Sequence, residues 1–160
     1  MGIASLHPSY GLRPGLLGLS IEMTIYDELD PIDDFEDRHG NELAVRRACD
    51  VMTAYLGEFL PLPKRAAEGL DVAERYRKHL IGLDGLVNER DALDERIRQT
   101  SKNLPEHRIL QAVSSILGFL QYPSWGGGAS EVISNFLDLL GEPESRRDTI
   151  VKLIEEKFGS

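Results

Sequence analysis

Apolar residues recur at three- and four-residue spacing over most of the chain, and this period predicts amphipathic α-helices. Gly82 and Gly85 weaken the longest periodic segment, because glycine disfavours a helix interior, so we expect one helix there or two that meet at a bend. The predicted helices span about residues 41–60, 71–100, 105–121, 130–140 and 144–158. Residues 41–160 are therefore predicted to form an all-α helical domain, a bundle of five or six amphipathic helices.

Several residues predict where these helices begin and end. Asn41 and Asp71 are expected N-caps, because their short side chains carry the oxygen acceptors that cap backbone N–H groups. Pro61 and Pro63 are expected to end the first helix. Gly141 is the expected C-cap of the helix before it, since glycine adopts left-handed backbone angles at low cost.

Residues 1–40 are predicted to be an N-terminal extended arm. Within it, the segment LSIEMTIY (residues 19–26) alternates apolar and polar side chains, which is the period of a half-buried strand. A single strand leaves its backbone donors and acceptors unpaired. We expect it to pair within the arm, with a second copy of the chain or with another protein, or else to pack over the helices as extended chain.

The end of the arm, YDELDPIDDFEDRHG (residues 26–40), holds seven acidic residues and one arginine. It contributes −6 of the net charge of −9. Such charge disfavours direct binding to nucleic acid or to anionic lipid, which require clustered lysine and arginine, and it favours a basic partner or a cation. Its acids alternate with an apolar row at Tyr26, Leu29, Ile32 and Phe35. A passive solvated linker, the other interpretation, has no need of that row.

Metal-site patterns are incomplete in the acidic stretch. No register places oxygen ligands, glycine and glutamate where an EF-hand loop requires them. Glu36 and His39 have the spacing of one half of a di-iron motif, but the chain has no second Glu-x-x-His. The sequence therefore predicts neither a metal site nor a cofactor.

Signals for nucleophilic catalysis are weak, and a non-enzymatic role is favoured. Cys49 lies on the apolar face of its predicted helix, where we expect a buried, inert thiol. The alternative is a helical-bundle enzyme, or a protein that binds a ligand or metal in a pocket between helices. The polar side chains expected to line such a pocket are Tyr55, Tyr76, His79 and His107.

The loop YPSWGGG precedes the predicted fourth helix and carries the only tryptophan, Trp125. Its glycines are expected to form a flexible connection, or to present backbone N–H groups to an anion at the helix N-terminus. Trp125 is expected either to close one end of the bundle or to anchor a partner, since tryptophan is frequent at interface hot spots.

The single cysteine and the absence of a long apolar segment favour a cytoplasmic protein. Cys49 has no partner for an intramolecular disulfide, which favours a reducing compartment. No segment reaches the roughly 20 apolar residues of a membrane span.

The sequence as a whole favours a non-enzymatic acidic interaction protein that binds a basic protein partner, such as an immunity protein, an antitoxin or another small inhibitor. A further alternative is an assembly subunit that forms a homodimer by strand exchange through the N-terminal arm. The residues predicted to contact the partner are Tyr26, Asp30, Ile32, Asp33, Asp34, Phe35, Glu36, Asp37 and Trp125.

Overall fold

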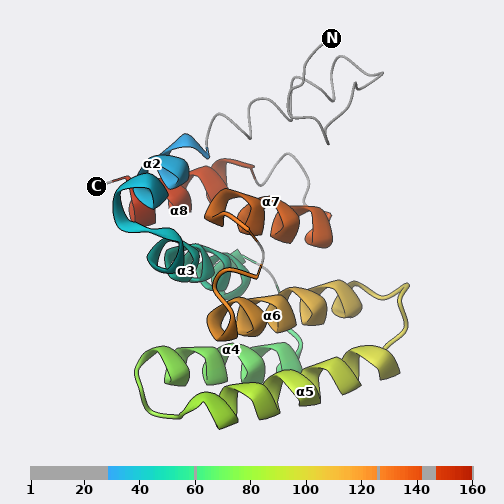
Figure 1. The fold of residues 1–160 in the computed structure, drawn as a ribbon. Coiled ribbons are helices and arrows are strands. Elements are labelled where there is room, and N and C mark those ends of the chain that lie inside the picture. The colour runs from blue at the N-terminus through green and yellow to red at the C-terminus, as the bar shows by residue number, and fades with distance from the viewer. Residues whose placement is uncertain (1–28, 60, 126, 142–146, 160) are drawn as a thin grey trace.

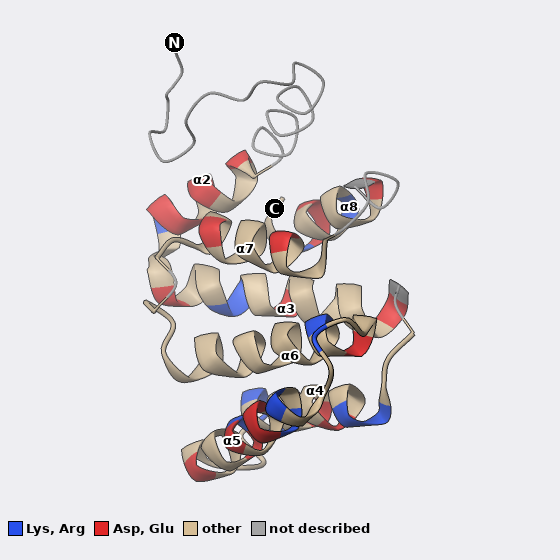
Figure 2. Ribbon diagram, turned by 90° about the vertical axis from the view of Figure 1, so that its right-hand side faces the viewer, with Lys and Arg blue, Asp and Glu red and all other residues tan. Residues whose placement is uncertain are grey.

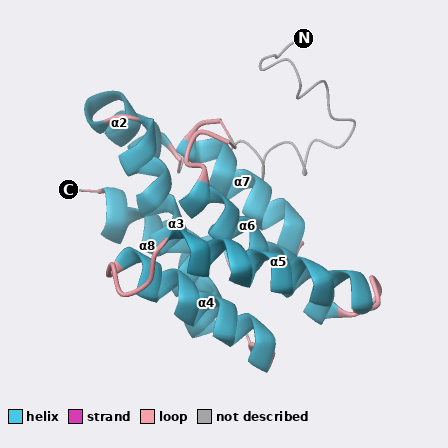
Figure 3. Cartoon of the chain, turned by 60° about the horizontal axis from the view of Figure 1, so that its bottom comes forward, coloured by secondary structure: helices cyan, strands magenta, loops and turns pink. Residues whose placement is uncertain are grey.

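The computed structural model describes residues 29–59, 61–125, 127–141 and 147–159, which are all-α (Figures 1 and 3). The strand-like segment 19–26, including Tyr26, lies outside the described residues, so its pairing stays a prediction. The all-α class is confirmed. The described residues form seven helices, six of them within residues 41–160, while the seventh lies in the segment that was predicted to be an extended arm. They are α2 (Asp30–His39), α3 (Asn41–Phe59), α4 (Lys64–Arg77), α5 (Leu83–Gln99), α6 (Pro105–Gln121), α7 (Ala129–Leu140) and α8 (Arg147–Phe158).

Helix α4 begins well before the predicted start at Asp71. Its first residue is Lys64, directly after Pro63, a position where the missing N–H of proline costs nothing. Asp71 therefore lies inside the helix, where it forms an exposed ion pair with Arg75 at 3.0 Å. The sequence pattern did not predict the first half of α4, because small side chains dominate the buried face of this helix. That face consists of Ala66, Gly69, Leu70 and Ala73.

The bend expected near the two glycines is confirmed, because α4 and α5 are separate helices. Gly141 is also the predicted C-cap, in the left-handed conformation with φ of 66°. Its backbone N–H donates to the carbonyls of Leu137 and Asp138. Glycine and proline therefore predicted where helices end better than polar side chains predicted where they begin.

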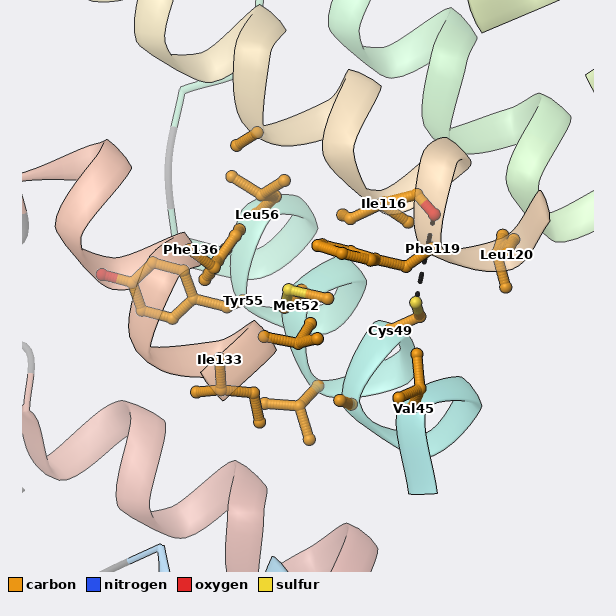
Figure 4. Packing of buried hydrophobic residues seen from close by; sticks show 14 of the residues in the cluster. Val45, Cys49, Met52, Tyr55, Leu56, Ile116, Phe119, Leu120, Ile133 and Phe136 are labelled. Carbon is orange, nitrogen blue, oxygen red and sulfur yellow. Dashed lines mark hydrogen bonds between the residues drawn. The ribbon is translucent and has the colours of Figure 1, made fainter. Parts of the chain in front are cut away.

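The helices stack with α3 and α6 at the centre (Figures 1 and 2). Helix α6 packs against α4 and α5 on one side, and α3 packs against α2, α7 and α8 on the other. Close approach of α4 to α6 requires Gly69, since a Cβ atom there would lie 2.7 Å from Val113 Cγ1. The middle of the core is a cluster of apolar side chains from α3, α6 and α7 (Figure 4).

Residues 30–39 of the acidic stretch form the helix α2, and one face of this helix belongs to the core. Leu29, Ile32 and Phe35 are buried, with Ile32 fully inaccessible to solvent. The Phe35 ring meets that of Phe158 edge to face at 5.3 Å, and the Arg47 guanidinium lies 4.8 Å from its centroid. The apolar row read from the sequence thus serves the fold, so Ile32 and Phe35 are not free to contact a partner.

None of the described helices combines the length and the apolar character that crossing a membrane requires.

We expect Ile32→Ala to lower the free energy of unfolding by about 2–4 kcal/mol, because it removes a fully buried side chain and leaves a cavity. Asp34→Ala, on the exposed face of the same helix, should change it by less than about 0.5 kcal/mol. Urea unfolding followed by circular dichroism measures both. Equal stability of the two variants would show that α2 does not belong to the cooperative core.

Candidate functional site

Four aspartates form a continuous stripe along the exposed side of α2. Asp30, Asp33, Asp34 and Asp37 are all exposed, and their i, i+3, i+4, i+7 spacing places them on one face of the helix. This face lies opposite the buried apolar row, and Figure 2 shows acidic positions along α2. We call these four residues the acidic stripe. The negative charge that is concentrated in this part of the sequence therefore lies on one exposed face of the helix.

The acidic stripe opposes helix stability. Asp30 with Asp34, and Asp33 with Asp37, are like charges at i, i+4, each pair costing about 0.2–0.5 kcal/mol. Asp30 and Asp33 stand in the first turn, where the helix dipole favours a negative charge, but Asp37 lies towards the other end, where it does not. Arg38 does not neutralise the stripe, because its Nε donates to the backbone carbonyl of Asp34 at 3.3 Å. Packing of α2 against the core has to offset this repulsion.

Glu36 has a different role, because it caps the N-terminus of α7. Its Oε1 accepts a hydrogen bond from the backbone N–H of Ala129 at 3.1 Å. Its Oε2 accepts one from the side-chain amide of Asn41 at 2.7 Å. Asn41 also donates to the carbonyl of Gly127 at 2.9 Å, so it links three segments and does not act as the N-cap expected from the sequence.

Asp33 adds a second link between the same two helices. The Ser130 hydroxyl donates a hydrogen bond to Asp33 Oδ1. The N–H of Gly128 is bonded within α7, to Glu131 Oε1 at 3.2 Å. The glycine loop therefore does not present the N–H groups of residues 128 and 129 to an external anion, because carboxylates of the chain already occupy them.

The cap from Glu36 was missed at the sequence level, although a signal for it exists. Residue 128 precedes α7 and is a glycine, which has no side chain to cap the helix. The first backbone N–H groups of a helix have no partner within it, so without a capping side chain they require an acceptor from elsewhere. Which of the chain's many carboxylates supplies it depends on tertiary packing.

Trp125 packs against one end of the bundle and is nevertheless largely exposed. One side of its indole packs on α6, where a Cβ atom at Gly118 would lie 2.8 Å from Trp125 Cζ3. The Phe119 ring lies 5.8 Å away, and the Arg90 guanidinium lies 4.9 Å from the indole. Even so, Trp125 is 59% exposed. It is therefore an exposed aromatic surface that α6 and the Arg90 guanidinium of α5 support.

Of the polar side chains expected in a pocket, two meet and two do not. Tyr76 and His79 line the same cleft, between α3 and the turn that joins α4 to α5. Tyr55 is buried in the core, 6.1 Å from the Phe136 ring. His107 is buried at the start of α6, and its Nδ1 has no hydrogen-bond partner among the described residues.

Cys49 is buried, as expected, and is held as a neutral thiol. Burial raises its pKa to about 12. Its Sγ lies 4.0 Å from the carbonyl oxygen of Ile116, to which it donates a weak hydrogen bond (Figure 4). A thiol with such a pKa is a poor nucleophile and a poor metal ligand. Within the described part of the chain, no three His, Cys, Asp or Glu residues are placed to hold a metal ion.

No protein-family model, curated protein or solved structure matches this chain.

We expect Glu36→Ala to lower the free energy of unfolding by about 1–2 kcal/mol, because it removes the cap of α7 and leaves the Asn41 amide with one acceptor fewer. Asp37→Ala removes the same charge from the next position and should cost nothing. Thermal unfolding of both variants makes the comparison. Equal losses would mean that Glu36 is only one more surface charge.

Neutralising part of the acidic stripe should stabilise the protein. We expect the double variant Asp34→Asn with Asp37→Asn to raise the free energy of unfolding by roughly 0.5 kcal/mol, through relief of like-charge repulsion. The gain should disappear in about 1 M NaCl, where the Debye length is only about 3 Å. A gain that persists in high salt would point to helix propensity and not to charge.

Proposed function

We propose that this protein is a non-enzymatic interaction protein that binds a basic protein partner through the acidic stripe of α2. Immunity proteins, antitoxins and other small inhibitors are the classes that this role suggests. The observation that supports it most is the geometry of the stripe: four aspartates on one exposed helix face, retained although they repel one another. Three of them, Asp30, Asp34 and Asp37, form no side-chain hydrogen bond or ion pair with another described residue, and exposed residues that cost stability without supporting the fold are typical of a binding surface.

The way α2 is held supports the same role. The apolar row fixes one side of the helix to the core, and Asp33 and Glu36 fasten it to α7. The exposed carboxylates of Asp30, Asp34 and Asp37 are therefore presented by a rigid element. A preorganised charged surface loses little conformational entropy on binding, and complementary charge accelerates association.

Charge alone provides little affinity, so the interface also needs apolar area. From the sequence, Tyr26, Ile32 and Phe35 were expected to supply this apolar area. Ile32 and Phe35 are buried, and Tyr26 lies outside the described residues, so we assign the role to Trp125. Its exposed ring is supported by α6, and the carbonyl of Gly127, two residues further along the chain, accepts a hydrogen bond from Asn41, just after α2. A basic side chain of the partner can stack on the indole, as Arg90 does from within the chain.

We also propose a location in the cell and, as an alternative, a mode of assembly. A cytoplasmic location agrees with Cys49, the only cysteine, being a buried thiol. Strand exchange through residues 19–26 remains the alternative basis for a homodimer. Direct binding of nucleic acid is disfavoured by the acidic stripe.

A capture experiment tests the proposal with a triple variant of the stripe, Asp30→Asn, Asp34→Asn and Asp37→Asn. Asp33 and Glu36 stay unchanged, because their hydrogen bonds hold α2 in place. Wild-type and variant proteins serve as bait in an extract of the native source. We expect a basic protein to be recovered by wild type and lost from the variant, and its association rate with wild type to exceed that with the variant by at least about tenfold at low salt.

A second triple variant controls for net charge. It removes the same three charges from exposed positions on α3 and α5, and consists of Glu58→Gln, Asp84→Asn and Asp91→Asn. This control should recover the basic protein as wild type does. Equal recovery by the stripe variant would remove the acidic stripe from the function, and equal loss in both variants would reduce its contribution to non-specific attraction.

A further inference from the structure

A cleft of about 690 Å³ separates α3 from the turn that joins α4 to α5. Glu42, Arg46 and Asp50 line it from α3, and the turn contributes residues between Tyr76 and Gly82. Its volume falls within the range of roughly 300–1,000 Å³ that is typical of small-molecule sites. It is lined by both charged and apolar side chains, and nothing in the acidic stripe contributes to it.

We propose that this cleft binds a small monocarboxylate that carries an apolar body. Arg46 would bind the carboxylate, and Tyr76, Leu80 and Ile81 would contact the apolar body. This site is separate from the acidic stripe and would hold a different kind of molecule. Three features of the cleft support this site: the backbone of the turn, the contacts of the two arginines, and the exposed leucine.

The turn holds His79 in a conformation that glycine normally occupies. The N–H of Leu80 donates to the carbonyl of Arg75, and that of His79 to the carbonyl of Tyr76, which together form a Schellman motif. His79 has φ of 62°, the only positive φ of a non-glycine residue among those described. A side chain there costs energy that glycine would avoid. Because this position lines the cleft, the imidazole is a candidate for contact with a ligand.

Of the two guanidinium groups in the cleft, only that of Arg46 can exchange its present partner for a ligand. Arg77 is largely buried and donates to Glu74 at 2.8 Å and to Thr53 at 3.5 Å, with Asp50 a further 3.5 Å ion-pair partner. Burial raises the pKa of Asp50, and the neighbouring Arg77 guanidinium counteracts this rise. Because its guanidinium is held by these contacts, Arg77 supports the fold and is not available to a ligand.

Arg46, in contrast, is held only by a surface ion pair. Its Nε and Nη2 both lie 3.3 Å from one oxygen of Glu42, and the Glu42 side chain is 69% exposed. Such pairs contribute little free energy. A ligand carboxylate can therefore replace Glu42 at low cost. A monoanion suits the cleft better than a phosphate dianion, because Glu42 and Asp50 remain close by.

The apolar part of the cleft explains why the ligand needs an apolar body. Leu80 is 69% exposed in the turn, and Ile81 and Tyr76 are partly exposed beside it. Burying these side chains against a hydrocarbon or aromatic group supplies the favourable free energy that one exposed ion pair lacks. Free acetate, which has almost no apolar body, should therefore bind far more weakly.

Titration with 4-phenylbutyrate, followed by ¹H–¹⁵N correlation spectra of the full chain, tests the site. We expect saturable shifts of backbone amides in residues 42–50 and 76–82, with acetate and the uncharged 4-phenylbutanol producing much smaller ones. Arg46→Gln should weaken binding about three- to fivefold, the loss expected for one partly exposed ion pair. Arg38→Gln, which removes an exposed guanidinium from α2, is the matched control and should bind as wild type does.

The absence of saturable shifts up to about 10 mM would overturn the proposal, as would equal shifts from the alcohol or equal affinity of wild type and Arg46→Gln. A second variant tests the turn. His79→Gly should raise Tm by roughly 2–4 °C through relief of the positive φ, and weaken binding severalfold. Unchanged affinity in this more stable variant would overturn the assignment of His79 to the site.

Discussion

The arrangement of α2, α3 and α7 depends on one carboxylate of α2 that accepts a hydrogen bond from the N-terminus of α7. Glu36 and Ala129 are separated by 93 positions in the chain, and their hydrogen bond closes the N-terminus of a helix that has no capping side chain of its own. The amide of Asn41 donates to the other oxygen of Glu36 and also to the carbonyl of Gly127. Glu36 is thereby connected, through Asn41, to the start of α3 and to the loop before α7. Buried apolar packing holds α2 against the core, whereas this polar junction sets its position along α7. The direction in which the exposed aspartates point follows from that position.

The acidic segment therefore contains two populations of carboxylate. Glu36, and in part Asp33, satisfy donors within the chain, and their loss would be felt as instability. Asp30, Asp34 and Asp37 form no ion pair with any described residue, and Asp30 and Asp34 repel each other at i, i+4. A count of charges along the sequence treats all five alike. Their separation into structural and exposed groups arises because a helix turns neighbouring residues to different sides.

Sequence patterns anticipated most of the helices and failed at specific points for physical reasons. Long apolar stripes, the break near Gly82 and the cap at Gly141 were readable because they depend on local chemistry. The apolar row was noticed, but Ile32 and Phe35 were assigned to a partner, because the dense acids around them concealed a short helix with one apolar face. Tyr76 and His79 were named as pocket residues, but the long-range contact from Glu36 to α7 has no local signature.

The position of Trp125 gives the molecule an intrinsic optical reporter. It is the only tryptophan, its ring is supported by α6 on one side, and Arg90 lies within stacking distance. Its exposed part samples solvent beside α6 and the Arg90 guanidinium. Fluorescence of the unlabelled protein therefore reports on one defined contact of the loop with α5 and α6, and not on an average over many rings.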